Sequence, residues 1–545
     1  MSKGVSEVVT YKDYHQNDHW LFPPTFSDFI PKDHFVRVVS KTIDDLHLYN
    51  HFLKKMKGGG ASRYNPIMLL KVITYCYMSG IYSSRQIAKQ CRENINVMWL
   101  SAMQKPDFRT INRFRNGVLK DTIEVIFIDL VKLLHSKGYI SLENYFLDGT
   151  KIESAANKYT FVWKKATDTN DAKLDEKLKV IIKDIEALTE KENEQYGDKD
   201  FSEEGDTTVT SADIIEVAQK IDDKIKELDN KEDKESKELK KQLTKTAKLI
   251  DKDYLPRKLK YEEYKSKFKG RNSFSKTDED ATFMRMKEDH MLNGQLKPGY
   301  NLQVGTENCF VLGYDVFPNP TDTRTFIPHL NNVMERLNCT FKTVIADAGY
   351  GSEENYDYLK EKGITGAVKY TSYEKEKKRS FKKKIYNAEN WQYDKEQQQY
   401  TCPNGNPVPY VKTILKKNAS GYEQEIKIFQ CENCEGCPCR DLCTKSYKGR
   451  MVQRNENWLA QKTEVKELLE TKEYKALMRR RSVECETVFG QIKSNQHFRR
   501  FLLRGNEKIG TEWGILMVGY NLKQIARLQR IEDEKKKEKM VIYGK

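Results

Sequence analysis

The feature that most constrains the fold is an apolar run that ends on an acidic residue, because this pattern occurs twice. Residues 145–147 precede Asp148, and residues 343–346 precede Asp347. Short apolar runs rich in β-branched or aromatic residues are typical of strands buried on both faces. A carboxylate at such a place is costly unless it is paired or binds a cation. We therefore expect two buried strands that end on functional acids, with Gly149 ending the first.

The segments between and after these acids alternate between strand and helix patterns. Residues 300–306 and 309–316 are predicted strands of a hairpin joined at Glu307-Asn308. A helix through Leu337 follows, and after Asp347 a second helix leads to a strand at 364–368. This order predicts an α/β core in which a long insertion separates the first strand from the hairpin.

Residues 19–135 contain several short helical patterns and are predicted to form an all-α N-terminal domain that binds DNA. Asp107 is expected to cap a helix whose apolar residues face a core, while Arg109 and Arg113 face outward. Basic side chains on one helix face suit contacts with DNA phosphates and bases. The alternative is an ordinary solvated face of a small helical bundle.

Residues 166–270 are dominated by Lys, Glu and Asp and carry apolar residues at heptad spacing. We expect a coiled-coil insertion that forms an antiparallel hairpin of two helical arms. Each arm alone is too short to be a stable helix, so it must pack against the other. Its second arm is expected to continue through a third apolar run. The runs are Leu174, Leu178, Ile181, Ile185, Leu188; Ile214, Ala218, Ile221, Ile225, Leu228; and Leu239, Leu243, Thr246, Ile250.

Residues 371–460 contain six of the eleven cysteines, all between Cys402 and Cys443. Clustered cysteines at Cys-x-x-Cys spacing are typical of a structural tetrahedral zinc site. We expect Zn²⁺ to stabilise a β-rich insertion here, with Cys431 and Cys439 as reserves. The four expected zinc ligands are Cys402, Cys434, Cys437 and Cys443.

The charge balance indicates an anionic partner. The chain has 95 Lys and Arg against 80 Asp and Glu, a net charge of +15 and a pI of about 9.0, and nucleic acid is the commonest partner of such a surface. The sequence has no long apolar run and no apolar signal core near Met1. We therefore expect a cytoplasmic, nucleoid-associated protein that does not bind a membrane.

A third candidate acid lies in residues 461–530, a region of helical pattern. Glu486 and Lys493 are seven residues apart and would share one helix face, whereas Glu484 would point about 200° away from Glu486. Two strand-end acids and one helical acid are what two-metal phosphoryl transfer requires. An ordinary surface salt-bridge face is the alternative.

Three motifs resemble those of DDE transposases of bacterial insertion sequences, namely residues 147–151, 346–350 and 488–493. More narrowly, they are similar to the branch with a Tyr-Arg-Glu-Lys signature around the catalytic Glu. The resemblance implies an RNase H-like catalytic core formed by residues 141–165, 271–370 and 461–530. It also implies Mg²⁺, or Mn²⁺, held by the catalytic acids Asp148, Asp347 and Glu486.

The third motif departs from this signature. Lys493 stands where the signature has Lys, but Ser482 and Arg479 stand where it has Arg and Tyr. Glu484 remains an alternative catalytic acid, because it would place Arg480 correctly although Gln491 would replace the Lys. The residues expected to contact DNA are Lys493, Arg481, Arg500 and Arg504, together with Arg109 and Arg113.

The hypothesis is therefore an insertion-sequence transposase that binds the terminal repeats of its element and performs cut-and-paste DNA transposition. Its partners would be double-stranded terminal-repeat and target DNA, and it would act as a homodimer or higher oligomer on DNA. Alternatives are a catalytically inactive or domesticated DNA-binding protein, a nuclease of the same fold, and a coiled-coil scaffold.

Overall fold

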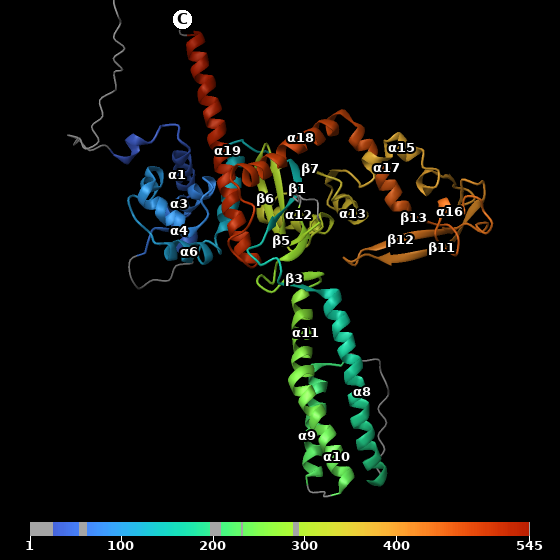
Figure 1. Cartoon of the computed structure of the whole chain (residues 1–545). Coiled ribbons are helices and arrows are strands. Elements are labelled where there is room, and N and C mark those ends of the chain that lie inside the picture. The colour runs from blue at the N-terminus through green and yellow to red at the C-terminus, as the bar shows by residue number, and fades with distance from the viewer. Residues whose placement is uncertain (1–24, 54–62, 197–208, 230–232, 287–293, 544–545) are drawn as a thin grey trace, which may run out of the picture. The chain divides into compact units, whose positions relative to one another are not determined.

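The computed structural model describes residues 25–53, 63–196, 209–229, 233–286 and 294–543 (Figure 1). Residues 19–24, the first of the predicted N-terminal domain, lie outside this part. The chain divides into two compact units, residues 1–119 with 522–545, and residues 120–521. Across the described ranges, no helix is both long and apolar enough to cross a membrane.

The described residues of the first unit form helices and no strand. The longest helix before residue 119, α3, begins with Pro66 at its first position, where a missing N–H costs nothing, and the side chain of Asn65 accepts hydrogen bonds from Ile67 N and Met68 N. Most of α3 is buried. The helices are η1 (Phe26–Phe29), α1 (Phe35–Asp45), α2 (Tyr49–Leu53), α3 (Pro66–Met78), α4 (Ser84–Glu93), α5 (Ile95–Leu100) and α6 (Phe108–Asn116).

A six-stranded sheet forms the centre of the second unit, with the order β4-β5-β1-β7-β8 and with β6 paired to β5. Strands β4, β5, β6 and β1 pair antiparallel, whereas β1, β7 and β8 pair parallel. The predicted mixed α/β architecture is therefore confirmed. The strands are β1 (Asn144–Glu153), β4 (Thr282–Arg285), β5 (Leu296–Glu307), β6 (Phe310–Phe317), β7 (Thr343–Ala346) and β8 (Thr365–Val368).

The first acid-bearing strand does not end at Gly149. Strand β1 continues to Glu153, so Asp148 lies in its middle. A Cβ atom on Gly149 would come within 2.7 Å of Gln303 Nε2 and 2.8 Å of Asp322 Oδ1. Glycine is thus required at this point by the close approach of side chains, and the prediction that it breaks the strand is wrong.

The β5–β6 hairpin turns one residue later than predicted. Asn308 and Cys309 have φ angles of 54° and 62°, as in the tight turns that suit a twisted hairpin. Glu307 instead completes β5, and its carboxylate accepts hydrogen bonds from Ser141 N and Leu142 N, both at 2.7 Å. This contact fixes the entry of β1 beside β5.

Helices pack on both faces of the six-stranded sheet. Helix α12 contacts β6, and α18 contacts β1, β5 and β7. Helix α7 contacts α12 and falls in the second unit, which begins at Lys120. The helices are α7 (Ile123–Ser136), α12 (Phe326–Leu337), α13 (Glu353–Glu361), α17 (Glu456–Glu470), α18 (Lys472–Phe489) and α19 (Asn506–Tyr543).

The Lys-rich insertion is a helical bundle, but not a hairpin of two arms. Helices α9 and α10 pack against each other (Figure 1), so the third apolar run packs against the second and does not continue it. Asp233 caps α10 by accepting from Ser236 N at 2.7 Å. The segments are α8 (Lys164–Tyr196), α9 (Ser211–Leu228), α10 (Lys234–Leu249), the π-helical η2 (Ile250–Tyr254) and α11 (Leu255–Phe268).

The apolar residues of the insertion meet in one core, which includes Leu174, Ile221 and Ile250. The side chain of Leu188 and the connecting residues 197–208 lie outside the described part. Strands β2 (Phe161–Trp163) and β3 (Ser273–Ser275) pair antiparallel and so bring the two ends of the insertion together.

The cysteine-rich insertion contains a second, five-stranded antiparallel sheet with the order β13-β12-β11-β10-β9. The β-rich character predicted for residues 371–460 is therefore observed. Its small apolar core includes Trp391, Tyr400 and Phe429. The strands are β9 (Gln392–Asp394), β10 (Gln399–Thr401), β11 (Pro407–Lys417), β12 (Glu423–Gln430) and β13 (Met451–Arg454).

Candidate active site

Asp148 lies within strand β1, and Asp347 directly follows the neighbouring strand β7. The parallel register pairs Tyr145 with Val344 and Phe146 with Ile345. Continued by two residues, this register brings Asp148 beside Asp347. Asp148 Oδ1 accepts from Gly149 N and Asp347 Oδ1 accepts from Gly349 N, each at 2.8 Å. Both carboxylates are thus oriented by backbone that the sheet fixes.

Tyr350 marks the point where the acids converge. Its side chain is fully buried and its hydroxyl donates to Gln303 Oε1. Burial raises the pKa of this hydroxyl well above its ordinary value, and the negative charges of Asp322, Asp148 and Asp347 raise it further, in that order. Three carboxylates therefore act on one hydroxyl group through their charge, and two of them are the acids predicted from the strand pattern.

Asp322 is the carboxylate that the sequence interpretation missed. It begins the short 3-10 helix η3 (Asp322–Arg324), and its Oδ1 accepts from Asn301 Nδ2 at 2.8 Å and from Gln303 Nε2 at 3.1 Å. The sequence signal was present but ambiguous, because an Asp between two Thr residues before a helix is typical of a helix cap.

Helix α18 presents its two glutamates to opposite flanks. Glu484 is 2% exposed, accepts from Cys309 N at 2.6 Å at the β5–β6 turn, and pairs with Arg480 at 2.8 Å. Residues two apart on an α-helix differ by about 200°, so the exposed Glu486 faces away from that turn. Strand β7 lies on this other side of β1. The contacts of Glu484 thus hold it at the β5–β6 turn, whereas Glu486 is exposed and stays a predicted third acid.

Lys493 does not lie on a regular continuation of α18. Residues Gly490–Asn495 form the π-helix η5, in which Gln496 N donates to Gln491 O at 3.0 Å. Glu486 and Lys493 were predicted to share one face of a regular helix, but the wider π-helical turn lies between them. Lys493 is buried, whereas Glu486 is exposed. Lys493 Nζ donates to Lys151 O at 3.0 Å, which ties the end of the helical segment to β1 three residues after Asp148.

The predicted DNA-contacting arginines of this unit lie close to β1. Arg481 Nη1 is 3.5 Å from Asp148 Oδ2. Arg500 donates to Ser154 O and Ala156 O at 3.0 and 2.9 Å, and Arg504 donates to Ala155 O at 3.2 Å. Arg481 is therefore a neighbour of the acid site, while the other two hold the segment that follows β1.

The acids provide the hard oxygen ligands that Mg²⁺ or Mn²⁺ prefers. However, no three His, Cys, Asp or Glu side chains in the described ranges are already arranged to hold a metal ion. The chemistry of the donor set therefore fits a divalent cation, and side-chain rotation would be needed to bring the oxygens together.

The six clustered cysteines line one small cavity in the cysteine-rich insertion. Burial raises the pKa of the Cys443 thiol and Arg450 opposes this, while nearby Cys434, Cys402 and Cys437 raise it further. The four predicted zinc ligands are therefore neighbours. Burial also raises the pKa of Cys431, to about 12.

In the all-α unit, Arg109 and Arg113 are exposed on α6, one turn apart. The predicted cap is present, since Asp107 Oδ1 accepts from Thr110 N at 2.7 Å. Arg85 of α4 was not predicted, yet it lies over the ring of Phe108 at 4.9 Å. Three exposed guanidinium groups therefore gather around the start of α6.

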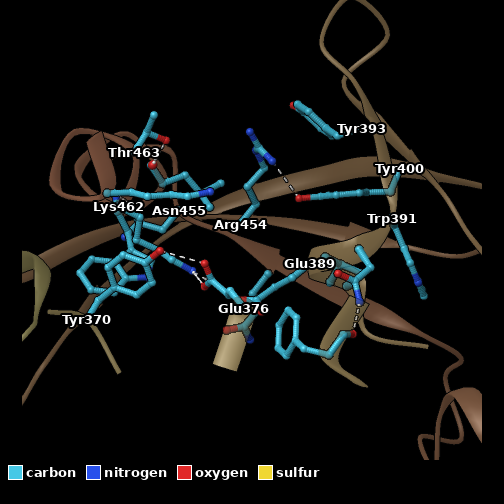
Figure 2. A pocket seen from close by; sticks show the side chains of 18 of the residues that line it. Tyr370, Glu376, Glu389, Trp391, Tyr393, Tyr400, Arg454, Asn455, Lys462 and Thr463 are labelled. Atoms are coloured by element: carbon cyan, nitrogen blue, oxygen red, sulfur yellow. Dashed lines mark hydrogen bonds and ion pairs between the residues drawn. The ribbon is translucent and has the colours of Figure 1, made fainter. Parts of the chain in front are cut away.

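A pocket of about 460 Å³ lies between α17 and the five-stranded sheet (Figure 2). Two of its charged groups have partners: Arg454 Nη1 donates to Tyr400 Oη at 3.0 Å, and Lys462 pairs with Glu376 at 2.6 Å. Both tryptophans line the pocket; Trp391 also belongs to the small core, and Trp458 stacks on Tyr356. Both tryptophans therefore have packing roles.

Two family models match parts of the chain. Residues 401–526 match the family described as Transposase DDE domain, and residues 24–117 match the Transposase domain (DUF772). Both models describe transposase domains, one of them of the DDE type, and each covers less than half of the chain. The first match contains Glu486, Lys493 and the clustered cysteines, and the second contains Arg109 and Arg113. No curated protein and no solved structure matches the chain.

Proposed function

We propose that this chain is a DDE-type transposase that binds the terminal repeats of its insertion sequence and performs cut-and-paste transposition by metal-dependent cleavage and strand transfer. The observation that supports this most is the placement of Asp148 in β1 and of Asp347 directly after the adjacent parallel strand β7. The match of residues 401–526 to a transposase DDE domain supports it independently.

Asp148, Asp347 and Glu486 would hold Mg²⁺ or Mn²⁺. When bound, such ions activate an attacking oxygen and stabilise the leaving oxygen of a phosphodiester. The backbone contacts of Gly149 and Gly349 orient two of the carboxylates before any ligand arrives. Exposed Glu486 can rotate toward them at little cost, because it is not held by packing. Water attacks in the cleavage step, and a freed 3′-hydroxyl attacks in strand transfer.

The central sheet would be an RNase H-like core of the Tyr-Arg-Glu-Lys branch. Three antiparallel strands, β6, β5 and β1, continued by the parallel strands β7 and β8, support the fold. Lys493 at seven residues from Glu486 supports the branch, although Ser482 departs from its signature.

DNA contacts would come from both units. Arg109 and Arg113 would bind DNA from the exposed face of α6, while Lys493, Arg481, Arg500 and Arg504 would lie along the DNA near the acids. Chemistry on two element ends requires two active sites, so the chain would act as a homodimer or higher oligomer on DNA, in the nucleoid of the cytoplasm.

The thiol cavity would be a structural zinc site of Cys402, Cys434, Cys437 and Cys443. Four neighbouring thiols and a donor to one of them, Arg450 N at 3.3 Å from Cys434 Sγ, support this.

The test uses a plasmid that carries the transposase gene with its flanking DNA. Asp148→Asn, Asp347→Asn and Glu486→Gln are assayed singly for end cleavage and for joining to a second plasmid, with DNA binding measured in parallel. We expect all three variants to bind DNA and to lose both reactions.

Two other outcomes would replace the proposal. If the wild-type protein binds the element ends but cleaves nothing with Mg²⁺ or Mn²⁺, it is a DNA-binding protein without catalysis. If it cleaves DNA but joins no 3′ end to target DNA, it is a nuclease. Retained joining in all three variants would refute the assignment of the acids.

A further inference from the structure

One carboxylate oxygen of Asp322, Oδ1, is fixed by hydrogen bonds from two side-chain amides. Asn301 and Gln303, whose side chains donate to Oδ1, are both fully buried on β5. Gln303 is itself held by the hydroxyl of Tyr350, which donates to its Oε1. The carboxylate of Asp322 is therefore anchored to the sheet through two side chains that have little freedom to move.

The other oxygen of Asp322 lies on the side of Asp347. A Cβ atom built on Gly349 would be 3.0 Å from Asp347 Oδ1 and 3.7 Å from Asp322 Oδ2. Both oxygens thus border the same small volume. Asp322 also approaches Gly149, the neighbour of Asp148: a Cβ atom built on Gly149 would be 2.8 Å from Asp322 Oδ1. Asp322 therefore stands between the two acid-bearing segments, although η3 is far from both in sequence.

The charges at this point are unbalanced in the described part of the chain. Arg481 pairs with Asp148, but no Lys, Arg or His there forms an ion pair with Asp322 or Asp347, whose carboxylates are half-buried. Two nearby carboxylates repel each other, and a divalent cation would relieve that repulsion.

We infer that Asp322 is a further carboxylate of the proposed metal site, acting with Asp347 to hold a divalent cation. The inference rests on the proposed function, because it assigns a residue to that same site. Asn301 and Gln303 are positioning residues: they fix Asp322 Oδ1 and thereby leave Oδ2 toward Asp347.

The test measures Mn²⁺ binding to the full-length protein by titration calorimetry without DNA. Asp322→Asn keeps the size of the side chain and an oxygen for the two amides but removes the charge. We expect the Kd for Mn²⁺ to rise about 10- to 100-fold, as when a supporting group of a metal site is lost. Asp280→Asn is the matched control, since Asp280 accepts from Asn506 N at 3.0 Å in the same unit, outside the acid cluster.

DNA cleavage as a function of Mn²⁺ concentration gives the second readout. If Asp322 helps to hold the cation, Asp322→Asn shifts the Mn²⁺ midpoint upward and cleavage returns at high Mn²⁺. A purely structural role would lower cleavage at every concentration without moving the midpoint.

Asn301→Ala keeps the inference testable if Asp322→Asn does not fold. It leaves the charge of Asp322 but removes one of its two amide donors, and a lost hydrogen bond of about 1 kcal/mol predicts an increase of about fivefold in Kd. An unchanged Kd in the folded variants would overturn the inference.

The same measurements distinguish a failure of the proposed metal site from a failure of the inference about Asp322. If Asp148→Asn and Asp347→Asn also leave Mn²⁺ binding and cleavage unchanged, the metal site itself is wrong. If those two variants lose binding while Asp322→Asn retains it, only the inference about Asp322 is wrong.

Discussion

The two sheets of the second unit hold their candidate ligands in different ways. In the six-stranded sheet, Asp148 lies within a strand and Asp347 directly after one, and each accepts a backbone N–H of the same segment. In the five-stranded sheet, the cysteines lie on turns and on the short helix α16 (Arg440–Cys443) around a cavity. The acids are therefore placed by the sheet, whereas the thiols lie on the turns and the short helix that extend beyond the sheet strands.

The difference predicts which region depends on its metal for folding. The core around β1 and β7 is extensive and includes fully buried Phe146 and Ile345, so it needs no ligand to form. The core of the cysteine-rich sheet has only a few buried residues, among them Trp391 and Phe429. A bound metal would add cross-links that so small a core cannot replace.

The largest expected effect is on catalysis in the first region. Asp148→Asn or Asp347→Asn should reduce end cleavage at least about 1,000-fold, equivalent to about 4 kcal/mol of activation free energy, while the thermal melting curve hardly changes. Single-turnover cleavage and melting by circular dichroism measure this. Loss of folding in both variants would show that these acids are structural and would remove the contrast between the two sheets.

A smaller effect is expected from the second region. Cys434→Ser should lower the zinc content measured by mass spectrometry and speed hydrogen exchange of β11 and β12 about 100-fold, equivalent to about 3 kcal/mol of local stability. Exchange of β1 should not change. Cys339→Ser, a half-buried cysteine away from the cavity, is the control, and equal exchange in both variants would contradict a structural metal.

DNA affinity should respond to the exposed arginines of α6. Arg109→Ala and Arg113→Ala should each reduce the slope of log K against log salt by about 1, because each removes one phosphate contact. Lys245→Ala removes an exposed charge from the helical insertion and serves as the control. An equal loss of slope in that control would mean that net charge, rather than the α6 surface, governs binding.

The smallest effect is expected from removing a single buried hydroxyl group, and it compares a tyrosine near the acids with a tyrosine elsewhere in the core. Tyr350→Phe and Tyr356→Phe each remove a buried hydroxyl that donates one hydrogen bond, to Gln303 and to Val368 O. Each should cost about 1 kcal/mol of unfolding free energy in urea. Only Tyr350→Phe should also change the Mn²⁺ dependence of cleavage, because of these two tyrosines only Tyr350 is near the acids. The same Mn²⁺ dependence in both variants would argue against a common site for the acids.

Local patterns in the sequence predicted the features that depend on neighbouring residues. The apolar strand before Asp347, the cap at Asp107 and the β-rich character of the cysteine-rich insertion were all predicted from short stretches, because strand alternation and capping are local effects. The placement of Glu484 and Glu486 on opposite flanks also followed from helix geometry alone.

The features that were missed depend on residues distant in sequence. Gly149 was taken for a strand end, but its role is to admit Gln303, Asp322 and Tyr350 beside the strand. Asp322 resembled a helix cap until Asn301 and Gln303 were seen to hold it. Likewise, heptad spacing could not show that α10 packs against α9 and does not continue it, since both helices carry the same apolar period.

The central claim is that the acids on β1 and β7 form one metal site. A crystal structure of the protein with Mn²⁺, with anomalous scattering recorded for the metal, tests it most directly. The account predicts anomalous density between the carboxylates of Asp148 and Asp347, with Glu486 turned toward it and Asp322 within reach. Density that avoids these acids, or that contacts Glu484 instead of Glu486, would contradict it.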